Sequence, residues 1–457
     1  MAGIGFRLRK FLKKGTILST FQAYGYSAVI GAGAWLIAVF GLISISLLVK
    51  PFFLYKKEII QFLTTTTYLF AGSLIFTGFF QLYFSRYIAD RMFEKKYNII
   101  LPNIIGMLTL TMVLAFIIVL PAYVVLIDTS YIYRILFIFL FVVLSGMWIL
   151  NIILSALKNY RYIFFSFALS YIIMFILAFI FSYFNMGLEG LMLAFFIGHT
   201  ILFFLLLFLI IFEFSGDKFI DFDFTKRERI YKYLLWTGLF YNLGIWIDKI
   251  IFWLHPDTGE FIISRLRASI FYDLPMFLAY ILMIPGMALF LLRLETDFAE
   301  KYEEFYDAVR EGGTLSVIRE RKDDMILTAK LALFEVFRGQ LIITLFSIIL
   351  AEPLFRIFHF PLVYIPIFNI LLLGTWLMLF FISILTILFY LDRQKETFLL
   401  TLSFFLLNAG LTLLSIKLGY EFYGLGFVLS TLIVSIIGLY VLRRVFDNLI
   451  YETFMLQ

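Results

Sequence analysis

Apolar residues fall along this chain in long runs of about twenty, separated by short polar gaps. A helix of roughly 20 apolar residues crosses about 30 Å of hydrocarbon, and only helices or closed barrels satisfy the backbone there. Barrel strands alternate in polarity over about 10 residues, whereas these runs are continuous. The pattern predicts an all-α, multi-pass membrane protein. We expect twelve transmembrane helices, near 17–49, 62–85, 100–126, 132–157, 162–184, 190–212, 233–254, 268–292, 329–350, 363–391, 397–416 and 422–442.

The composition agrees with this class. Hydrophobic residues make up 63% of the chain and charged residues 15%, whereas soluble domains carry about 25% charged residues. The chain contains no cysteine, which excludes disulfides and thiolate metal sites.

The cations set the expected orientation. If the spans alternate, 27 of the 37 Lys and Arg residues fall on the side of the N-terminus. Short cytoplasmic loops carry an excess of Lys and Arg, so we expect both termini in the cytoplasm. The net charge of +6 is then typical of contact with the inner leaflet, not of nucleic-acid binding.

Six predicted spans precede one polar stretch and six follow it, as expected for a transporter of two helical bundles. The predicted organisation is a basic cytoplasmic segment at 1–16, a first six-helix bundle at 17–212, a cytoplasmic linker at 213–232, a second six-helix bundle at 233–442 and a cytoplasmic tail at 443–457.

A further cytoplasmic segment, 293–330, is the longest polar stretch of the chain. Four of its apolar side chains recur at helical spacing and share one helix face, while the other positions are largely acidic. They are Phe298, Tyr302, Phe305 and Val309. Gly312 and Gly313 are expected to end this helix. One interpretation is an amphipathic helix resting on the bundle or the lipid interface, and the other is a docking surface for a cytoplasmic partner.

Catalytic signatures are largely absent. No Gly-Lys dipeptide exists, so there is no P-loop, and the three His residues are too dispersed for a metal site. Asp221-Phe222-Asp223 resembles a metal-binding pair of glycosyltransferases, but its loop is too short for such a domain, which favours a solvated turn. We therefore expect no enzymatic activity, no catalytic residue, no metal and no cofactor.

Polar residues inside apolar spans are candidates for a transport path, because a charge at mid-bilayer costs about 2.5–3.5 kcal/mol and usually faces inward. They are Asn242, Trp246, Asp248, Lys249, Asp273, Glu335, Arg338 and His199. Asp273 is expected to pair with Lys249 across adjacent helices. Glu335 and Arg338 are spaced to pair within one helix. For these charges, structural pairing and path lining are both open, and His199 favours a satisfied core residue. Pro275 and Pro285 predict a kinked eighth span.

Several motifs resemble those of one known family. They are Met1-Ala-Gly-Ile-Gly-Phe6, Leu8-Arg9-Lys10, Ala23-Tyr24, Gly33-x-Trp35, Arg86-x-x-x-Asp90-Arg91, Leu101-Pro102-Asn103, Asn242-Leu-Gly-Ile-Trp-x-Asp-Lys249, Tyr272-Asp-Leu-Pro-Met-Phe-Leu-Ala-Tyr280, Arg293-Leu-Glu-Thr-Asp-Phe298 and Phe305-Tyr306. The chain is similar in these to the PelG family, the inner-membrane transporters of Pel exopolysaccharide systems. The last four spans match only in general character.

The resemblance implies a member of the multidrug, oligosaccharidyl-lipid and polysaccharide exporter superfamily that passes a nascent amino-sugar polymer across the cytoplasmic (inner) membrane. It also implies partners, namely a cytoplasmic glycosyltransferase and membrane proteins of a cyclic-dinucleotide-regulated synthase complex. The alternatives are an ion-coupled, alternating-access exporter of drugs or lipid-linked oligosaccharide, and a scaffold for a polysaccharide synthase.

Overall fold

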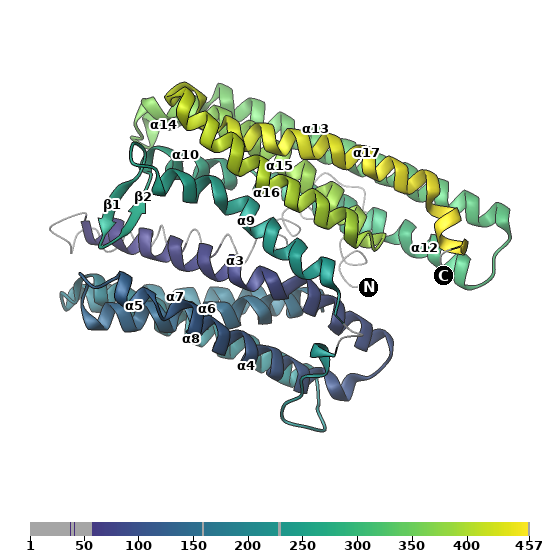
Figure 1. Ribbon diagram of the computed structural model, residues 1–457, viewed down its shortest axis with the longest axis horizontal. Helices are drawn as coiled ribbons and strands as arrows, with labels where there is room; N and C mark the ends of the chain where they lie inside the picture. Colours follow the sequence, from purple (N-terminus) through teal and green to yellow (C-terminus); the bar gives the residue numbers. More distant parts are fainter. Residues whose placement is uncertain (1–36, 38–40, 42–56, 158–159, 227–229, 456–457) are drawn as a thin grey trace. The chain divides into compact units, whose positions relative to one another are not determined.

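The protein is nearly all helical, with one small hairpin. The computed structural model describes residues 57–157, 160–226 and 230–455, together with positions 37 and 41 (Figure 1). The α-helices are α3 (Lys57–Phe93), α4 (Ile100–Val119), α5 (Ala122–Val125), α6 (Tyr131–Ala156), α7 (Tyr160–Tyr183), α8 (Gly187–Glu213), α9 (Lys232–Leu254), α10 (Ile270–Ile281), α11 (Ile284–Leu292), α12 (Ala299–Arg310), α13 (Leu315–Ile349), α14 (Ala351–Ile357), α15 (Ile365–Tyr390), α16 (Gln394–Leu418) and α17 (Leu425–Met455). The shorter elements are the 3₁₀ segments η2 (Tyr97–Ile99), η3 (Asp223–Thr225), η6 (Leu362–Tyr364) and η7 (Tyr420–Phe422), the π-helical segment η5 (Arg293–Phe298) and the strands β1 (Glu260–Ile263) and β2 (Leu266–Ala268).

Ten helical stretches in the described part of the chain are long and apolar enough to cross a membrane. They coincide with ten of the predicted runs. The run predicted near 233–254 forms α9, which is helical but not among the ten, because Asn242, Asp248 and Lys249 lower its hydropathy. The run predicted at 17–49 and the motifs before residue 36 lie outside the described residues. The total of twelve spans and the sides of the two termini stay predictions, as do the limits of the predicted domains.

The chain divides into two compact units. Gly33–Trp246 and Trp253–Ser269 belong to the first unit, whereas Ile247–Phe252 and Ile270–Gln457 belong to the second. The division falls within α9, so this helix contributes residues to both units.

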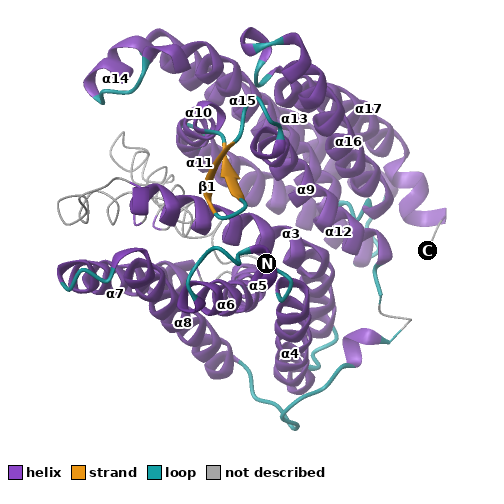
Figure 2. Cartoon of the chain, turned by 60° about the vertical axis from the view of Figure 1, so that its left-hand side comes forward, coloured by secondary structure: helices purple, strands orange, loops and turns teal. Residues whose placement is uncertain are grey.

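In the first unit, α6 is the central helix and packs against α3, α4 and α8, while α7 packs along α8 (Figure 1). The hairpin of β1 and β2, drawn in orange in Figure 2, contacts α3 and was not expected from the sequence. Tyr68 of α3 donates a 2.9 Å hydrogen bond to the Arg267 carbonyl, and Gln61 donates one of 3.2 Å to the Ile262 carbonyl. These side chains fix the hairpin, which is too short to be stable alone.

In the second unit, α15 is central and packs against α10, α13 and α17, while α16 packs on α17. The predicted eighth span is interrupted just before Pro285, whereas Pro275 lies inside the helix α10. The α-helix ends at Ile281, resumes at Ile284 and passes through η5 into α12. Gln340 donates a 3.1 Å hydrogen bond to the Leu282 carbonyl at the break. A break in the span is thereby confirmed near Pro285, and a neighbouring helix satisfies the backbone there.

Gly312 ends the helical turn after α12 with a φ of +71°, a left-handed conformation that glycine adopts without strain. The next helix, α13, begins at Leu315 and continues to Ile349 without a break. The part of the predicted cytoplasmic segment 293–330 that follows the glycines and the predicted ninth span therefore form one continuous helix. The composition changes from polar to apolar within α13. The helix continues through this change because no glycine or proline lies there.

Two glycines bring α3 and α9 into close contact within the first unit. A Cβ atom built on Gly238 would lie 2.1 Å from the carbonyl oxygen of Gly78, so only glycine fits there. Small residues allow this approach between helices in membranes, where packing contributes to association.

We predict that Gly238→Ala lowers the thermal unfolding temperature of the purified protein, because overpacking costs about 1–3 kcal/mol. The matched control is Gly410→Ala in α16, where an added Cβ meets no atom within 4 Å. Equal unfolding temperatures for the two variants would contradict the proposed contact.

Candidate functional site

Asp248 and Lys249 form a buried ion pair in the second unit. Lys249 Nζ lies 3.2 Å from Oδ1 and 3.3 Å from Oδ2 of Asp248, and the Tyr272 hydroxyl donates a 2.6 Å hydrogen bond to Oδ2. Asp248 has 0% and Lys249 6% of its surface exposed. A lone charge in hydrocarbon is costly, so mutual neutralisation permits this burial.

Aromatic rings enclose the pair. Phe252, four residues after Asp248 on α9, stacks on Tyr272 with the ring centroids 3.9 Å apart. Lys249 Nζ lies 5.2 Å from the ring of Tyr280 and 5.7 Å from that of Phe427. The charge and the rings therefore join α9, α10 and α17. In this closed arrangement, the Asp248 carboxylate holds these helices together.

The other charges predicted for a path are placed differently. Glu335 pairs with Arg293 of η5 at 2.5 Å and not with Arg338, as its spacing had indicated. The π-helical turn brings Arg293 to Glu335, while the guanidinium of Arg338 lies over the ring of Phe334. Asp273 is half-buried in the first turn of α10, and its pairing with Lys249 stays a prediction.

The remaining path candidates belong to the first unit. His199 is 1% exposed, its Nδ1 lies 3.0 Å from the Phe195 carbonyl and its Nε2 lies 3.4 Å from the Tyr171 hydroxyl. It is therefore a satisfied core residue. Asn242 and Trp246 are half-buried on α9, and Asn242 donates a 2.9 Å hydrogen bond to the Gly238 carbonyl.

The four apolar residues of the acidic amphipathic helix are placed within the second unit. Phe298 and Phe305 are fully buried, and the Phe298 ring contacts that of Tyr390 on α15 at 5.5 Å. Tyr302 and Val309 are half-buried beside them. The helix thus rests on the chain's own bundle with these rings. Its outer side carries the exposed Asp307 and Arg310.

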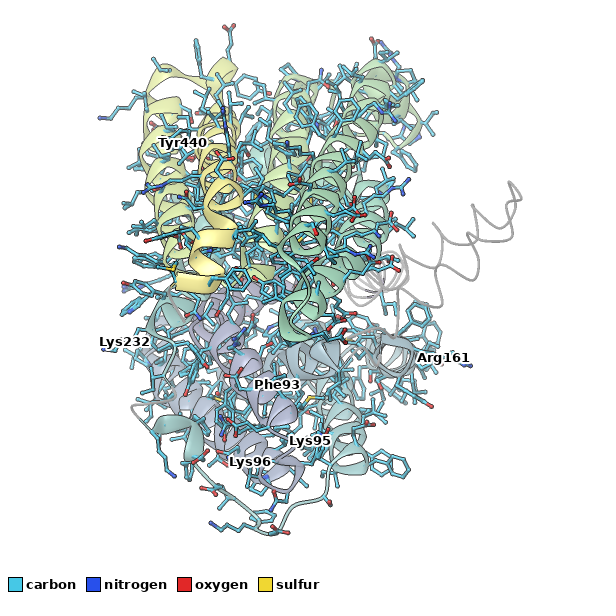
Figure 3. All side chains as sticks on the ribbon, turned by 90° about the vertical axis from the view of Figure 1, so that its right-hand side faces the viewer. Phe93, Lys95, Lys96, Arg161, Lys232 and Tyr440 are labelled. Carbon is cyan, nitrogen blue, oxygen red and sulfur yellow. The ribbon has the colours of Figure 1, made fainter. Side chains whose placement is uncertain are left out.

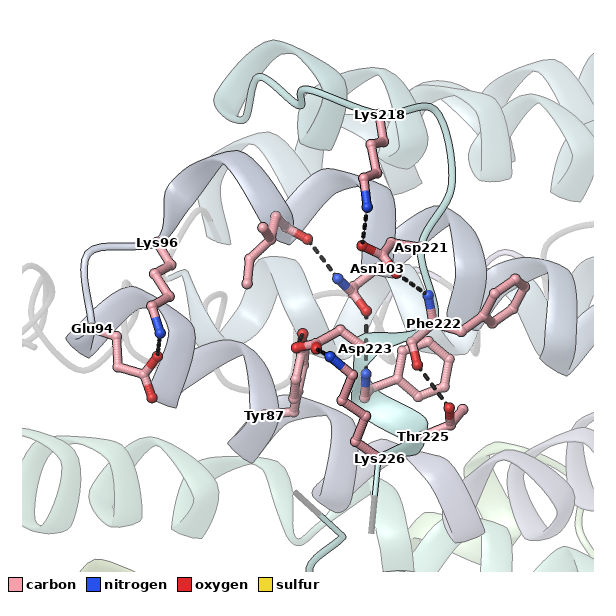
Figure 4. Close-up of polar contacts among 12 residues, drawn as sticks. Tyr87, Glu94, Lys96, Asn103, Lys218, Asp221, Phe222, Asp223, Thr225 and Lys226 are labelled. Carbon is pink, nitrogen blue, oxygen red and sulfur yellow. Dashed lines mark hydrogen bonds and ion pairs between the residues drawn. The ribbon is translucent and has the colours of Figure 1, made fainter. Parts of the chain in front are cut away.

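The segment between α8 and α9 makes a contact that was not expected from its sequence. Asp223 is 8% exposed, accepts a 2.9 Å hydrogen bond from the Tyr87 hydroxyl and pairs with Lys226 at 2.8 Å (Figure 4). Phe224 is 1% exposed and its amide donates a 3.3 Å hydrogen bond to Asn103. The expectation of a solvated turn at Asp221–Asp223 is therefore wrong for Asp223.

The same segment also meets α3 and α4 at other points. The Asp221 amide donates a 3.0 Å hydrogen bond to the Pro102 carbonyl, and the Tyr83 hydroxyl donates one to the Phe224 carbonyl. Tyr231 donates to Asp90, and burial together with this carboxylate raises the pKa of the Tyr231 phenol above its ordinary value. In the sequence, the apolar Phe residues of the segment between α8 and α9 were the one indication that this segment packs against α3 and α4.

One end of the first unit is rich in cations. Lys95 and Lys96 follow α3 there, Arg161 lies in the first turn of α7 and Lys232 begins α9 (Figure 3). The side chain of Phe93 is 80% exposed among them. Among the described residues, no group of three or more His, Asp or Glu residues is placed to hold a metal ion.

Solved structures with a similar fold define the class. An outward-facing multidrug resistance MATE transporter of the MOP superfamily aligns with a TM-score of 0.64 at 12% identity, covering 93% of this chain and 96% of its own. An inward-facing form aligns with a TM-score of 0.61 at 13% identity, covering 93% and 94%. A MOP superfamily transporter from Pyrococcus furiosus Vc1 (DSM3638), described as having a binding pocket of reverse polarity, aligns at 0.62 and 13%, covering 93% and 96%. The fold is that of a MATE-like membrane transporter.

The family follows from the sequence as a whole. The family model of PelG, exopolysaccharide exporter (EPS-E), matches residues 1–454. The chain therefore belongs to the PelG family of exopolysaccharide exporters, as its motifs had indicated. A comparison with functionally curated proteins gave no match. Family and fold are both those of transporters.

We predict that Asp248→Ala destabilises the protein by about 3–5 kcal/mol, because Lys249 is left buried without its carboxylate. Thermal unfolding in detergent measures the loss. As a control, Glu352→Ala breaks the exposed pair of Glu352 and Arg356, which costs about 1 kcal/mol at most. Asp248→Leu combined with Lys249→Met should recover most of the stability. Equal unfolding temperatures for Asp248→Ala and Glu352→Ala would contradict the buried pair.

We also predict that Phe224→Ala frees the segment between α8 and α9, since removing a buried phenyl ring costs about 3–5 kcal/mol. Trypsin should then cut faster after Lys218 and Lys226. Phe219→Ala is the matched control, because that ring is 85% exposed in the same segment. If both variants were cut at the wild-type rate, Phe224 would not hold the segment.

Proposed function

We propose that this protein exports a nascent exopolysaccharide across the cytoplasmic membrane while a cytoplasmic glycosyltransferase extends the polymer. The observation that carries the proposal is the match to an exopolysaccharide exporter family over residues 1–454, on a transporter fold. The resemblance of the motifs to Pel systems adds the substrate class, an amino-sugar polymer.

The proposed topology has twelve spans in two six-helix bundles, with both termini in the cytoplasm. Ten span-capable stretches and the additional helix α9 support it. The cation-rich end of the first unit is then cytoplasmic, in agreement with the positive-inside rule (Figure 3). The hairpin and the turns before α6 and α8 face the outside.

The proposed path uses half-buried polar and aromatic residues. Asn242 and Trp246 offer an amide and an aromatic face to sugar hydroxyls and rings, and Asp273 offers a carboxylate. Asp248 is enclosed by its partners, so we propose that it holds the path's helices in place.

Docking of the synthase partners is proposed on the outer side of α12. Phe298 and Phe305 are covered by the bundle, so the surface left to a partner is the polar one around Asp307 and Glu311. This surface carries Asp307 and Glu311 together with Arg310, which pairs with Asp307, so it offers charges of both signs to the glycosyltransferase or to the membrane proteins of the synthase complex.

A second candidate is ion-coupled, alternating-access export of drugs or lipid-linked oligosaccharide. The transporters of similar fold are described in outward-facing and inward-facing forms, which favours such a cycle. Protonation of Asp248 or Asp273 would then drive it. A scaffold role is the remaining alternative.

The test uses inverted membrane vesicles from cells that express the synthase genes and lack their own exporter. We predict that adding this protein gives polymer inside the vesicles when a labelled nucleotide sugar is supplied outside. Polymer inside is measured as the label protected from an added hydrolase. Transport should continue with a protonophore present, because elongation supplies the push.

Each alternative has its own outcome in this assay. Ion coupling would be supported instead by two results together. Transport would be lost when the protonophore is added, and it would also be lost in the double variant Asp248→Asn with Asp273→Asn. Normal synthesis with no protected polymer would indicate a scaffold. Co-purification of the glycosyltransferase with the tagged protein, weakened by Asp307→Lys with Glu311→Lys, tests the partner surface.

A further inference from the structure

Arg338 is an exposed cation within a membrane span. It lies in α13, which is one of the stretches long and apolar enough to cross a membrane, and its side chain is exposed instead of turned into the bundle. Within the described ranges, its guanidinium lies 5.3 Å from the ring of Phe334 and pairs with no carboxylate. A charge that faces lipid without a counter-charge is costly. This position therefore needs a partner from outside the chain.

The carboxylate nearest to Arg338 in the sequence is already engaged. Residues 325–349 include one acidic residue, Glu335, and it pairs with Arg293 at 2.5 Å. Because Arg293 directly follows α11, this pair marks the level at which the apolar span ends. Arg338 lies three residues further into the span, about 4.5 Å along the helix axis. Its long side chain can reach the lipid headgroups from there.

The side chain of Arg338 is directed toward that headgroup level. Phe334, whose ring it contacts, is one helical turn closer to the polar end of α13. Lys330, a further turn back, is exposed and forms no ion pair with any residue that the structure describes. Residues four apart are neighbours on a helix, so the two cations and the ring form one row. Such a row attracts an anion.

Exposed apolar side chains continue the row toward the middle of the span. Ile342, one turn beyond Arg338, is 48% exposed, and Leu345 and Phe346 are exposed after it. A soluble anion would leave these side chains uncovered, whereas acyl chains can cover them. The surface therefore has a cationic end at the headgroup level and an apolar continuation, which matches the chemistry of an anionic phospholipid.

A helix of another membrane protein could also neutralise Arg338 with a carboxylate. Such a helix would best meet a guanidinium directed away from α13. Here the guanidinium lies back along α13 over Phe334, and Lys330 lies on the headgroup side of the pair of Glu335 and Arg293. These positions favour a headgroup over a second helix.

We propose that the row of Lys330, Phe334, Arg338 and Ile342 binds an anionic phospholipid, whose phosphate contacts Arg338 and whose acyl chains cover the apolar residues. In the orientation given above, the site belongs to the inner leaflet, whose surface charge comes from anionic lipids. The inference goes beyond polymer export and takes only this orientation from the proposed function.

The experiment measures which lipid lies beside residue 342. The sequence contains no cysteine, so Ile342→Cys gives the full chain a single site for a bimane fluorophore. The labelled protein is placed in vesicles of phosphatidylglycerol and phosphatidylcholine in equal amounts, with brominated acyl chains on one lipid or on the other. Bromine quenches a fluorophore that it contacts. We expect about fivefold enrichment of phosphatidylglycerol at the label, the effect of one cation near an anionic surface.

The variants separate charge from position. Arg338→Gln with Lys330→Gln should make the quenching by the two lipids equal, because both cations are removed. Arg338→Lys keeps the charge and should keep most of the enrichment. Since Arg338 is exposed and pairs with no carboxylate of the described chain, both variants should unfold at the temperature of the parent protein, which checks that they are folded.

The matched control places the label on another exposed part of the surface. Ile172 of α7 is 58% exposed, and no Lys or Arg occurs within ten residues of it in the sequence. A bimane at Ile172→Cys should therefore be quenched equally by the two brominated lipids.

Three results would overturn the inference. The first is equal quenching by the two lipids at residue 342, and the second is enrichment that persists without both cations. The third is weak quenching by both lipids, because a second copy of the chain would then cover α13. No polymer is present in this measurement, so absence of export in the earlier vesicle assay would reject the proposed function without affecting the lipid site.

Discussion

Hydrocarbon offers no hydrogen bonds, so every polar group that enters it must find its partner within the protein. This constraint explains why nearly all of the described chain is helical. It also explains the exceptions. Where helix α10 breaks at Leu282, Gln340 takes the place of the missing backbone donor. Where Asp248 and Lys249 enter the second unit, they neutralise each other and Tyr272 occupies a carboxylate oxygen. The interruptions of regular structure and the buried charges therefore obey the same rule.

The two units satisfy this rule with different kinds of contact. The second unit closes its charges behind aromatic rings, so Asp248 is better suited to holding helices than to meeting a substrate. The first unit buries neutral polar groups such as His199, which lies beside the Phe195 carbonyl and the Tyr171 hydroxyl, and hydrogen bonds tie its helices together at both ends. The segment around Asp223 and Phe224 ties α3 to α4 at the cation-rich end, and the hairpin ties α3 to the turn before α6 at the other. The helices of the first unit are therefore held at both of its ends.

Much of the fold was predictable because long apolar runs and their flanking cations are local signals. The positions of the span-capable helices, the helix break before Pro285 and the end of α12 at Gly312 all depend on neighbouring residues. The candidate site was less predictable. Helical spacing predicted that Glu335 pairs with Arg338. In the structure Glu335 pairs instead with Arg293, which lies in the π-helical segment η5. The burial of Asp223 depends on Tyr87, more than a hundred residues away in the chain.

The sequence by itself determined the class of the protein, its family and the approximate limits of the helices, since hydropathy, charge distribution and motifs act over a few tens of residues. Only the tertiary structure decided which partner each polar group has and how deeply it is buried. Asp248 and Glu335 are both carboxylates within apolar helices, yet one is enclosed by Lys249 and Tyr272 while the other is half-buried beside Arg293. The difference arises because burial and pairing depend on distances between helices, and these distances are set by packing that no local pattern encodes.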